Sequence, residues 1–159
     1  MSTTATLPYG AILVNGSPYL ERVQLFTAKR TISAQFQSLP RQRLTLPGVA
    51  TFSLKGLSRV TLSNPLSGIS DFPFLFRLST TAGATPGYTG PRGIFDDFAL
   101  STTCFGSGQF PFPLIPPVLV DASGSLIYDI QDYGLGIDDI NDYPYDIWLT
   151  FHGHYLIPL

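Results

Sequence analysis

Residues that interrupt helices are spread through the whole chain. Fourteen Pro and fifteen Gly occur among 159 residues, so few stretches of a dozen residues lack one. Strong helix formers are scarce at the same time, with one Glu, two Lys and one Met. Because Pro and Gly are the least favourable residues inside a helix, we expect a protein with few helices.

Short runs in which β-branched and aromatic residues alternate with polar ones predict strands instead. The expected strands are Ala11–Asn15, Glu21–Thr27, Thr31–Gln37, Ala50–Leu54, Ser58–Ser63, Phe74–Ser79, Pro117–Asp121, Ser125–Gln131 and Asp146–His152. Turn sequences such as Asn15-Gly16 and Pro47-Gly48 separate them. Many short strands between turns are typical of sandwiches and barrels. The predicted fold class is all-β, as a single antiparallel β-sandwich or a jelly-roll-like barrel.

The last expected strand has the clearest alternation. One set of side chains should face the core and the other the surface or an interface, since successive residues of a strand point to opposite faces. The predicted core set is Ile147, Leu149 and Phe151, and the predicted outer set is Trp148, Thr150 and His152.

The length fits one domain, which can bury roughly 70% of the surface of its unfolded chain. We expect residues 1–9 to form an extended N-terminal arm and residues 10–159 to form the single β domain. Within it, residues 80–93 are rich in Gly, Thr and Pro and predict a long loop.

The composition favours a protein that is buried against others. Charged residues make up 13% of the chain, about half the usual fraction, and uncharged exposed surface tends to be covered by partners. We therefore expect a homo-oligomer. The pI near 5.5 and the absence of a basic run argue against nucleic acid. The first apolar run, Ala11–Val14, is too short for a signal peptide or a membrane span, which predicts a protein made in the cytoplasm with no membrane partner.

Positive and negative charges occupy different parts of the chain. All nine Lys and Arg residues lie at or before Arg92, together with two carboxylates, so residues 1–92 carry 9 − 2 = +7. Residues 93–159 carry the other nine carboxylates and hence −9. Segregated charge can orient neighbouring subunits before contact, or it can be cancelled inside one domain. The sequence leaves both possibilities open.

Two groups of residues contain metal-ligand types without a complete pattern. The acidic stretch could bind Ca²⁺ through carboxylate oxygens, but it lacks the central Gly and distal Glu of an EF-hand; it comprises Asp129, Asp132, Asp138, Asp139, Asn141, Asp142 and Asp146. An ordinary solvated loop or a docking patch for a basic neighbour is the alternative. His152 and His154 should share a strand face, yet no third ligand is apparent. We expect no metal and no cofactor.

No residue set predicts catalysis. The chain has no Gly-x-Ser-x-Gly sequence, and Cys104 is expected to be a small buried residue. Asp96 and Asp97 would point to opposite faces of a strand, which weakens them as a carboxylate pair. The Gly-rich segments Gly106–Gly108 and Gly87–Gly93 lack the Lys-Ser/Thr of a phosphate-binding loop. We therefore expect no enzymatic activity.

Four residues are candidates for partner binding. Arg41 and Arg43, two residues apart, could bind a carboxylate-bearing partner; equally, they could protect an exposed strand edge from stray pairing. Tyr145 and Trp148 are expected to be exposed, where with Tyr143 they could also form a platform that stacks on sugars. The proline-dense segment Phe110–Pro117 should run as an edge or connector and contact the outside of the sheet or a neighbour.

The order of segments at the C-terminal end resembles that of a known protein class. Phe112–Pro117 is a proline-rich apolar lead-in, Leu126–Ile130 is a strand, and Tyr145–Pro158 has an apolar-His-Gly-aromatic ending. This pattern is similar to the closing part of small β-rich virion proteins of tailed bacteriophages. The resemblance covers residues 110–159. It implies a decoration or cement protein on the capsid surface of a virion, commonly a trimer seated where subunits of the major capsid protein meet, with no catalytic residues.

Two other functions remain open from the sequence. A module on a phage tail or fibre could bind a glycan or receptor through Trp148. A hydrolase could use carboxylates such as Asp97 or Asp139.

Overall fold

The structure is a computed structural model, and it describes residues 10–48, 50–62, 72–81, 92–95, 97–107, 109–134 and 143–159. Among these residues it is almost entirely β, with one short helical turn, α1 (Ser101–Cys104). The predicted all-β fold class is confirmed. The predicted arm, residues 1–9, lies outside the described residues, as does most of the predicted loop, 82–91.

Ten strands form two antiparallel sheets. The strands are β1 (Ala11–Val14), β2 (Ser17–Ile32), β3 (Ser38–Thr45), β4 (Thr51–Leu62), β5 (Phe74–Thr80), β6 (Arg92–Gly93), β7 (Ala99–Leu100), β8 (Phe112–Val120), β9 (Ser125–Asp132) and β10 (Tyr145–Pro158). The first sheet, which we call sheet A, has the order β1-β2-β10-β4-β8. The second, sheet B, has the order β3-β9-β5-β6, with β7 also paired to β5.

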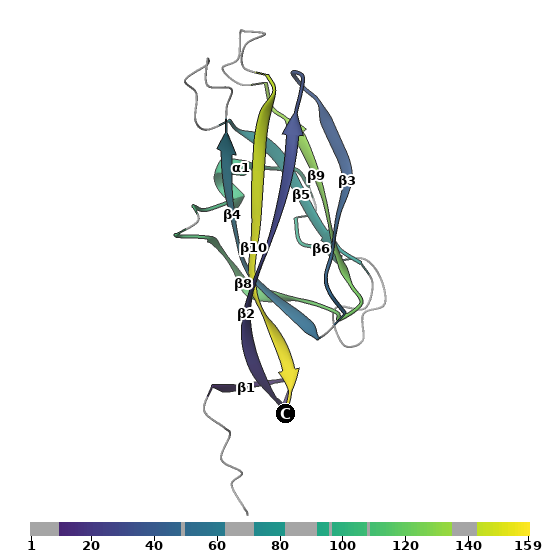
Figure 1. Cartoon of the computed structure of the whole chain (residues 1–159), viewed down its shortest axis with the longest axis vertical. Coiled ribbons are helices and arrows are strands. Elements are labelled where there is room, and N and C mark those ends of the chain that lie inside the picture. Colours follow the sequence, from purple (N-terminus) through teal and green to yellow (C-terminus); the bar gives the residue numbers. More distant parts are fainter. Residues whose placement is uncertain are drawn as a thin grey trace, which may run out of the picture.

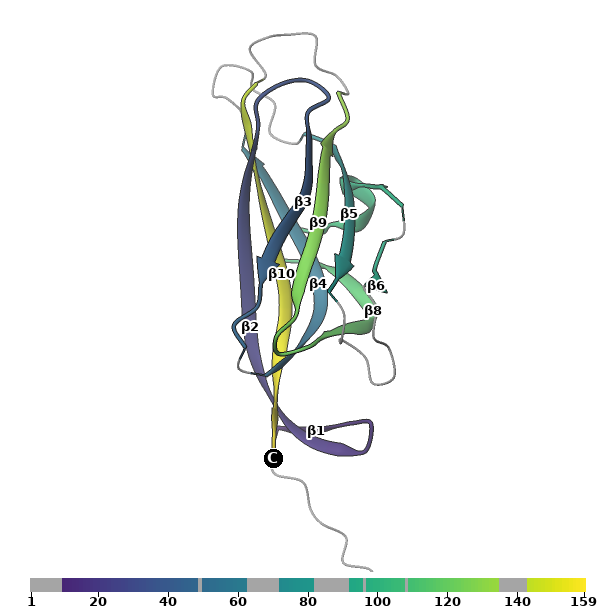
Figure 2. The ribbon, with the colours of Figure 1, turned by 90° about the vertical axis from the view of Figure 1, so that its right-hand side faces the viewer.

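The strand order is that of a jelly roll. Leaving out the short β1 and β7 and numbering the other strands along the chain, sheet A reads 1-8-3-6 and sheet B reads 2-7-4-5. The chain therefore crosses between the sheets repeatedly, as in double-sheet jelly rolls. Figures 1 and 2 show the two layers, with β2 and β10 running most of the length of the molecule.

Alternating side chains of both sheets fill the space between the layers. On β10, Ile147, Leu149 and Phe151 are fully buried while Trp148 is exposed, so the predicted alternation is confirmed. On β5 the same period buries Phe74, Phe76 and Leu78. The central position of β10 in sheet A, between β2 and β4, explains why its pattern is the clearest in the sequence.

A bulge at the centre of sheet A depends on a glycine. The register between β10 and β4 shifts between His152 and Gly153, where Lys55 is the extra residue of β4. A Cβ on Gly153 would lie 2.3 Å from the backbone oxygen of Ser53 and 2.5 Å from the ring of Phe52. Only glycine fits at this approach.

Several strand predictions were wrong in extent. The predicted strand Thr31–Gln37 does not form: β2 continues to Ile32, and a turn follows. The strand β3 was missed because Pro40 and a bulge between Leu39 and Gln42 break its period of two. Two predicted strands are one, β4, since Gly56 lies at the bulge and does not end the strand.

The proline-dense segment forms an edge strand, as the sequence predicts. β8 is the last strand of sheet A, and it contains Pro113, Pro116 and Pro117. An edge strand tolerates proline because one side of its backbone has no strand to bond. No described helix is long and apolar enough to cross a membrane.

Candidate interaction surface

The outer face of sheet A, which points away from sheet B, carries exposed side chains on three of its strands. Its side chains come from β2, β10 and β4, in rows set by the strand register. One row consists of Lys29, Trp148 and Val60, and the next consists of Thr31, Asp146 and Leu62. Trp148, one of the four predicted partner-binding residues, therefore lies on an open face.

Three apolar side chains of this face form an exposed cluster, which we call the Trp148 patch. Trp148 is directly opposite Val60, and Leu62 is one row away. Their exposed fractions are 37%, 51% and 53%. Opposite and diagonal neighbours on one sheet face are in reach of each other, so the three side chains form a continuous apolar surface. Sequence analysis missed Val60 and Leu62, although their alternation with Arg59 and Thr61 carried the signal.

An ion pair borders the Trp148 patch. Lys29 Nζ lies 2.8 Å from Asp146 Oδ2 and 5.6 Å from the centre of the Trp148 ring. Hydrogen bonds from Lys29 and Thr31 hold the pKa of Asp146 below its ordinary value. Because Lys29 covers part of the indole, the ring is poorly placed to stack on a sugar.

The two histidines share this face further along β10, as predicted, but each has protein partners. His152 Nε2 lies 2.6 Å from Ser58 Oγ. His154 Nδ1 lies 2.9 Å from Lys55 Nζ and 3.1 Å from Glu21 Oε2. Burial lowers the pKa of His152. Burial alone would raise the pKa of Glu21, but hydrogen bonds from Lys55 and His154 outweigh it, so this pKa is lowered.

The expectation that Tyr145 is exposed was wrong. Its side chain points into the core, because it has the same parity on β10 as Ile147, and it is 1% exposed. The ring stacks on Phe72 at 4.5 Å, and the hydroxyl donates to Asp132 Oδ1 over 2.6 Å. Burial, followed by the contact with Asp132, raises the pKa of Tyr145. Tyr145 and Trp148 face opposite sides of the sheet, so the predicted aromatic platform is not formed.

Arg41 and Arg43 lie on β3, the edge strand of sheet B. Arg41 is at the bulge with a φ of +51°, and its backbone N–H donates to Asp129 Oδ1 over 2.6 Å. Arg43 Nε donates to Ser125 Oγ over 3.0 Å. Both residues are exposed. Their position at an edge fits the edge-protecting interpretation, and their role in partner binding stays a prediction.

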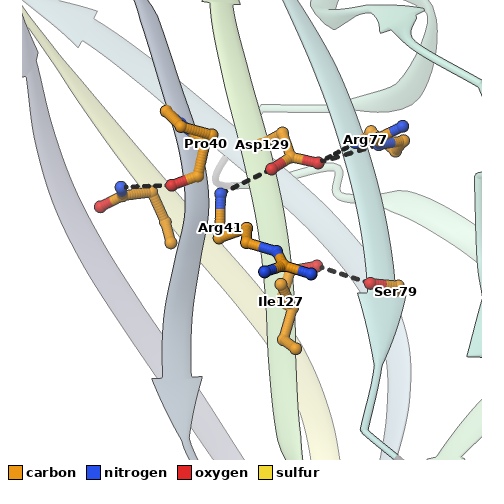
Figure 3. A network of polar contacts seen from close by, with 7 residues as sticks. Pro40, Arg41, Arg77, Ser79, Ile127 and Asp129 are labelled. Carbon is orange, nitrogen blue, oxygen red and sulfur yellow. Dashed lines mark hydrogen bonds and ion pairs between the residues drawn. The ribbon is translucent and has the colours of Figure 1, made fainter. Parts of the chain in front are cut away.

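Asp129 links three strands of sheet B. Besides the N–H of Arg41 on β3, it accepts from Arg77 of β5, with Nε at 2.8 Å and Nη2 at 2.7 Å from Oδ2. Figure 3 shows the carboxylate between these two partners. Asp129 is 8% exposed. The carboxylate is thus a structural group that holds the bulged edge strand in place.

The described part of the acidic stretch is engaged within the protein. Asp132 accepts from the hydroxyls of Tyr143 and Tyr145, each over 2.6 Å, and from the N–H of Phe36. Residues 135–142, which include Asp138, Asp139 and Asp142, lie outside the described residues. Among the residues that the structure describes, no group of three potential metal ligands occurs.

The opposite charges of the two halves of the sequence meet within one chain in at least two places. Lys29 pairs with Asp146, and Arg77 pairs with Asp129. In each pair the cation precedes residue 92 and the carboxylate follows it. Part of the charge segregation is therefore cancelled inside the domain.

Two further apolar side chains are exposed at the β8 edge and just before it. Phe110 is 78% exposed and Ile115 is 87% exposed. The nearby prolines prevent this edge from extending the sheet, so its contact with a partner would be made by side chains.

The described hollows do not have the composition of a carboxylate active site. An open hollow of about 410 Å³ has Arg59, Thr102 and Ser107 in its lining, but none of its described lining residues is Asp or Glu. Asp97 is exposed elsewhere, while Asp96 and Asp139 lie outside the described residues. Cys104 is buried, as predicted, and burial raises the pKa of its thiol to about 12, so it is protonated at neutral pH.

No family model matches the chain, and no curated protein matches it. Among solved structures, the chain is similar to a structure of infectious bursal disease virus, Gx strain, at 12% identity and a TM-score of 0.31, with 100% of this chain and 47% of that chain covered. It is also similar to T=1 particles derived from infectious bursal virus, at 11% identity and a TM-score of 0.28, with 100% and 45% covered. The chain thus spans about half the length of the chains it matches.

Proposed function

We propose that the chain is a non-enzymatic structural protein of a virus particle, which binds subunits of the major capsid protein and holds them together. The observation that carries the proposal is the Trp148 patch on the outer face of sheet A. An aromatic residue with adjacent aliphatic side chains is the usual centre of a protein interface.

A protein that bridges subunits needs more than one contact, and the structure offers two separate ones. The Trp148 patch lies on the face formed by β10 and β4, while Phe110 and Ile115 lie at the β8 edge. Both sites adjoin a two-sheet scaffold with one continuous hydrophobic core. Such a scaffold keeps the distance between the two sites fixed, which suits a clamp on a shell.

The virion part of the proposal is supported by the jelly-roll strand order and by the C-terminal resemblance to phage head proteins. Jelly rolls occur in viral capsids, but also in lectins and cupins, and a fold alone does not determine a function. The location on the outer capsid surface, the bacteriophage host and the trimer are inferred from the resemblance.

The test is to mix the purified chain with phage heads that lack a decoration protein. We expect it to sediment with the heads and to raise their melting temperature. Val60→Lys should abolish both effects by placing a charge in the Trp148 patch, whereas Leu13→Lys, at a similarly exposed residue on β1 (60% against 51%), should not. Absence of binding by the wild-type chain would overturn the proposal.

A second candidate is that the chain is itself the subunit of a small shell. The strand order favours this candidate as well, since jelly rolls build capsids. Electron microscopy of the purified chain separates the two functions. Closed particles without any other protein would favour a shell subunit, and their absence together with binding to heads would favour decoration.

A further inference from the structure

One edge of sheet A is long, and the described strands cover only its first part. β2 pairs with β10 along one side from Tyr19 to Ile32, but on its other side β1 covers only Ser17 to Leu20. Among the described residues no strand pairs with the β1 side of residues 21–32. This segment, which we call the β2 edge, presents free backbone groups.

The hairpin between β1 and β2 shows which residues present those groups. Val14 and Ser17 flank a two-residue turn, Asn15-Gly16, in which both residues have positive φ. Residues that flank such a turn bond to each other, so Ser17 and every second residue after it point their N–H and C=O toward the β1 side. The alternate residues point toward β10, in agreement with the bond from the N–H of Leu159 to the carbonyl of Pro18. Along the β2 edge the free groups therefore belong to odd-numbered residues.

Two carbonyls of the edge are bonded by neighbouring side chains of the same strand. Gln24 Nε2 donates to the carbonyl of Leu25 over 3.1 Å, and Arg30 Nη1 donates to that of Lys29 over 2.6 Å. Both acceptors are odd-numbered. The Gln24 side chain can move aside when another strand supplies N–H groups, whereas the Arg30 guanidinium, 5.5 Å from the centre of the Tyr128 ring, bonds a carbonyl near the end of the edge.

The other long edges carry features that prevent strand pairing, and the β2 edge does not. β3 has Pro40 and a bulge, and β8 has three prolines. These are common protections against edge-to-edge association. The β2 edge has no proline, and its register with β10 shows no shift over its whole length.

We propose that the β2 edge pairs with the same edge of a second copy of this chain, antiparallel and about a two-fold axis at Leu25. Residues 21–29 then face residues 29–21 of the second copy. Leu25 lies opposite Leu25, Val23 opposite Thr27, and Glu21 opposite Lys29. Each of these pairs joins odd-numbered residues, which is the arrangement in which both backbone hydrogen bonds form.

Charge determines this register. The side chains of Glu21 and Lys29 lie on the outer face of sheet A, where both already make ion pairs. In the proposed register the two-fold axis creates the cross-strand pair Glu21–Lys29 twice. A shift by one pair of residues places Lys29 opposite Val23 or opposite Tyr19, and the complementary charges no longer meet. Cross-strand pairs of opposite charge stabilise a sheet, and such matching sets the register.

The contact would join two copies of sheet A into one continuous sheet. Both Trp148 patches would then lie on the same extended face, so a shell could be bound at two points. The inference does not rest on the proposed function, because the purified chain alone tests it. A two-fold contact gives a dimer, and it differs in this respect from the trimer that the resemblance implies.

Sedimentation equilibrium of the purified chain is the first test. We expect a dimer in the wild type. Leu25→Lys should give a monomer, because two like charges meet at the axis. Val60→Lys is the matched control, since Val60 has the same exposed fraction, 51%, on the same face but away from the edge. A monomeric wild type, or dimers of Leu25→Lys as stable as those of the wild type, would overturn the proposal.

Two further experiments test the contact and do not depend on whether one variant folds poorly. One swaps the charges of Glu21 and Lys29, and the other measures amide hydrogen exchange of the wild type. Glu21→Lys should weaken the dimer at least tenfold, and Glu21→Lys combined with Lys29→Glu should restore it. The amides of Val23, Leu25 and Thr27 should exchange slowly in concentrated solution and fast on dilution. Fast exchange of these amides in a dimeric sample would show that another surface forms the dimer, and would refute the proposal.

Discussion

The edges β2 and β3 both carry positive charge, yet their backbones differ. On β3 the chain bulges at Arg41, whose N–H turns inward to Asp129. On β2 the backbone is regular, and its odd-numbered groups point outward. Charged side chains alone therefore do not distinguish an interface from a protected edge. The path of the backbone does, because only a regular edge can offer a complete ladder to a partner strand.

This comparison changes the interpretation of the predicted partner-binding residues. Arg41 and Arg43, with Lys29 and Arg30 before them, form the densest basic segment of the sequence. The basic residues of the β2 edge are Arg22, Lys29 and Arg30, and of these Lys29 has an opposite charge, Glu21, at the same distance from Leu25. An antiparallel self-contact needs such spacing, since opposite charges must lie at equal distances from its centre.

Proline substitutions at the neighbouring residues Gln24 and Leu25 of β2 should give the largest difference in stability between two variants. Gln24→Pro removes an N–H that points toward β10 and should destabilise the fold by about 3 kcal/mol. Leu25→Pro removes an N–H that points outward and should cost about 1 kcal/mol, while it blocks the dimer. Urea unfolding measures both changes. Equal losses for the two variants would contradict the assignment of odd-numbered residues to the free edge.

Removing the carboxylate of Asp129, which holds the β3 edge, should give the next largest loss of stability. Asp129→Ala leaves Arg77 and the N–H of Arg41 without their acceptor, in a site where the Asp129 side chain is 11% exposed. We expect a loss of about 2 kcal/mol in the free energy of unfolding.

Asp146→Ala is the control for that substitution. Its pair with Lys29 is more open, with exposed fractions of 47% for Lys29 and 30% for Asp146, so we expect a loss below about 1 kcal/mol. If the two variants lose the same stability in urea unfolding, Asp129 does not anchor the β3 edge.

The sequence predicts the fold where the period of two is intact. It holds along β10 and β5, whose alternate side chains are buried. It fails at β3, where a bulge inserts a residue, and at Gly56, where a continuous strand contains a residue typical of turns. Bulges arise from the pairing of strands distant in sequence, so local periodicity does not contain them.

The candidate surface could be predicted only in part, for a related reason. Trp148 was assigned to the outer set from alternation on β10 alone. Val60 and Leu62 join it through the register between β10 and β4, which brings together residues almost ninety positions apart. Tyr145 was predicted to be exposed because the expected strand began at Asp146, one residue too late. Tyr145 therefore was not assigned to the same face as Ile147, which points into the core.

Glycine substitutions at Arg41 and Arg43 of β3 should change the free energy of unfolding in opposite directions. Arg41 has a φ of +51°, which costs a non-glycine residue free energy, so Arg41→Gly should stabilise the fold by up to about 1 kcal/mol. Arg43→Gly should destabilise it by about 0.5–1 kcal/mol, since glycine weakens an ordinary strand position. Thermal unfolding of the two variants measures the difference. The same sign for both would show that the bulge at Arg41 is not strained.

Lowering the pH should change the stability least among these tests. The groups that respond lie on the outer face of sheet A, beside the β2 edge. His152 has a pKa below its ordinary value of 6.5, so the unfolded chain binds a proton more readily, and stability falls slightly as the pH drops below 6.5. Glu21 and Asp146 have pKa values below 4.5 and 3.8, so the stability they contribute at higher pH is lost only as the pH falls through these lowered values. His152→Gln should remove the first decrease and keep the second, as measured by urea unfolding between pH 7.5 and pH 3.5. Identical pH profiles for the variant and the wild type above pH 5 would show that the environment of His152 does not favour its neutral form.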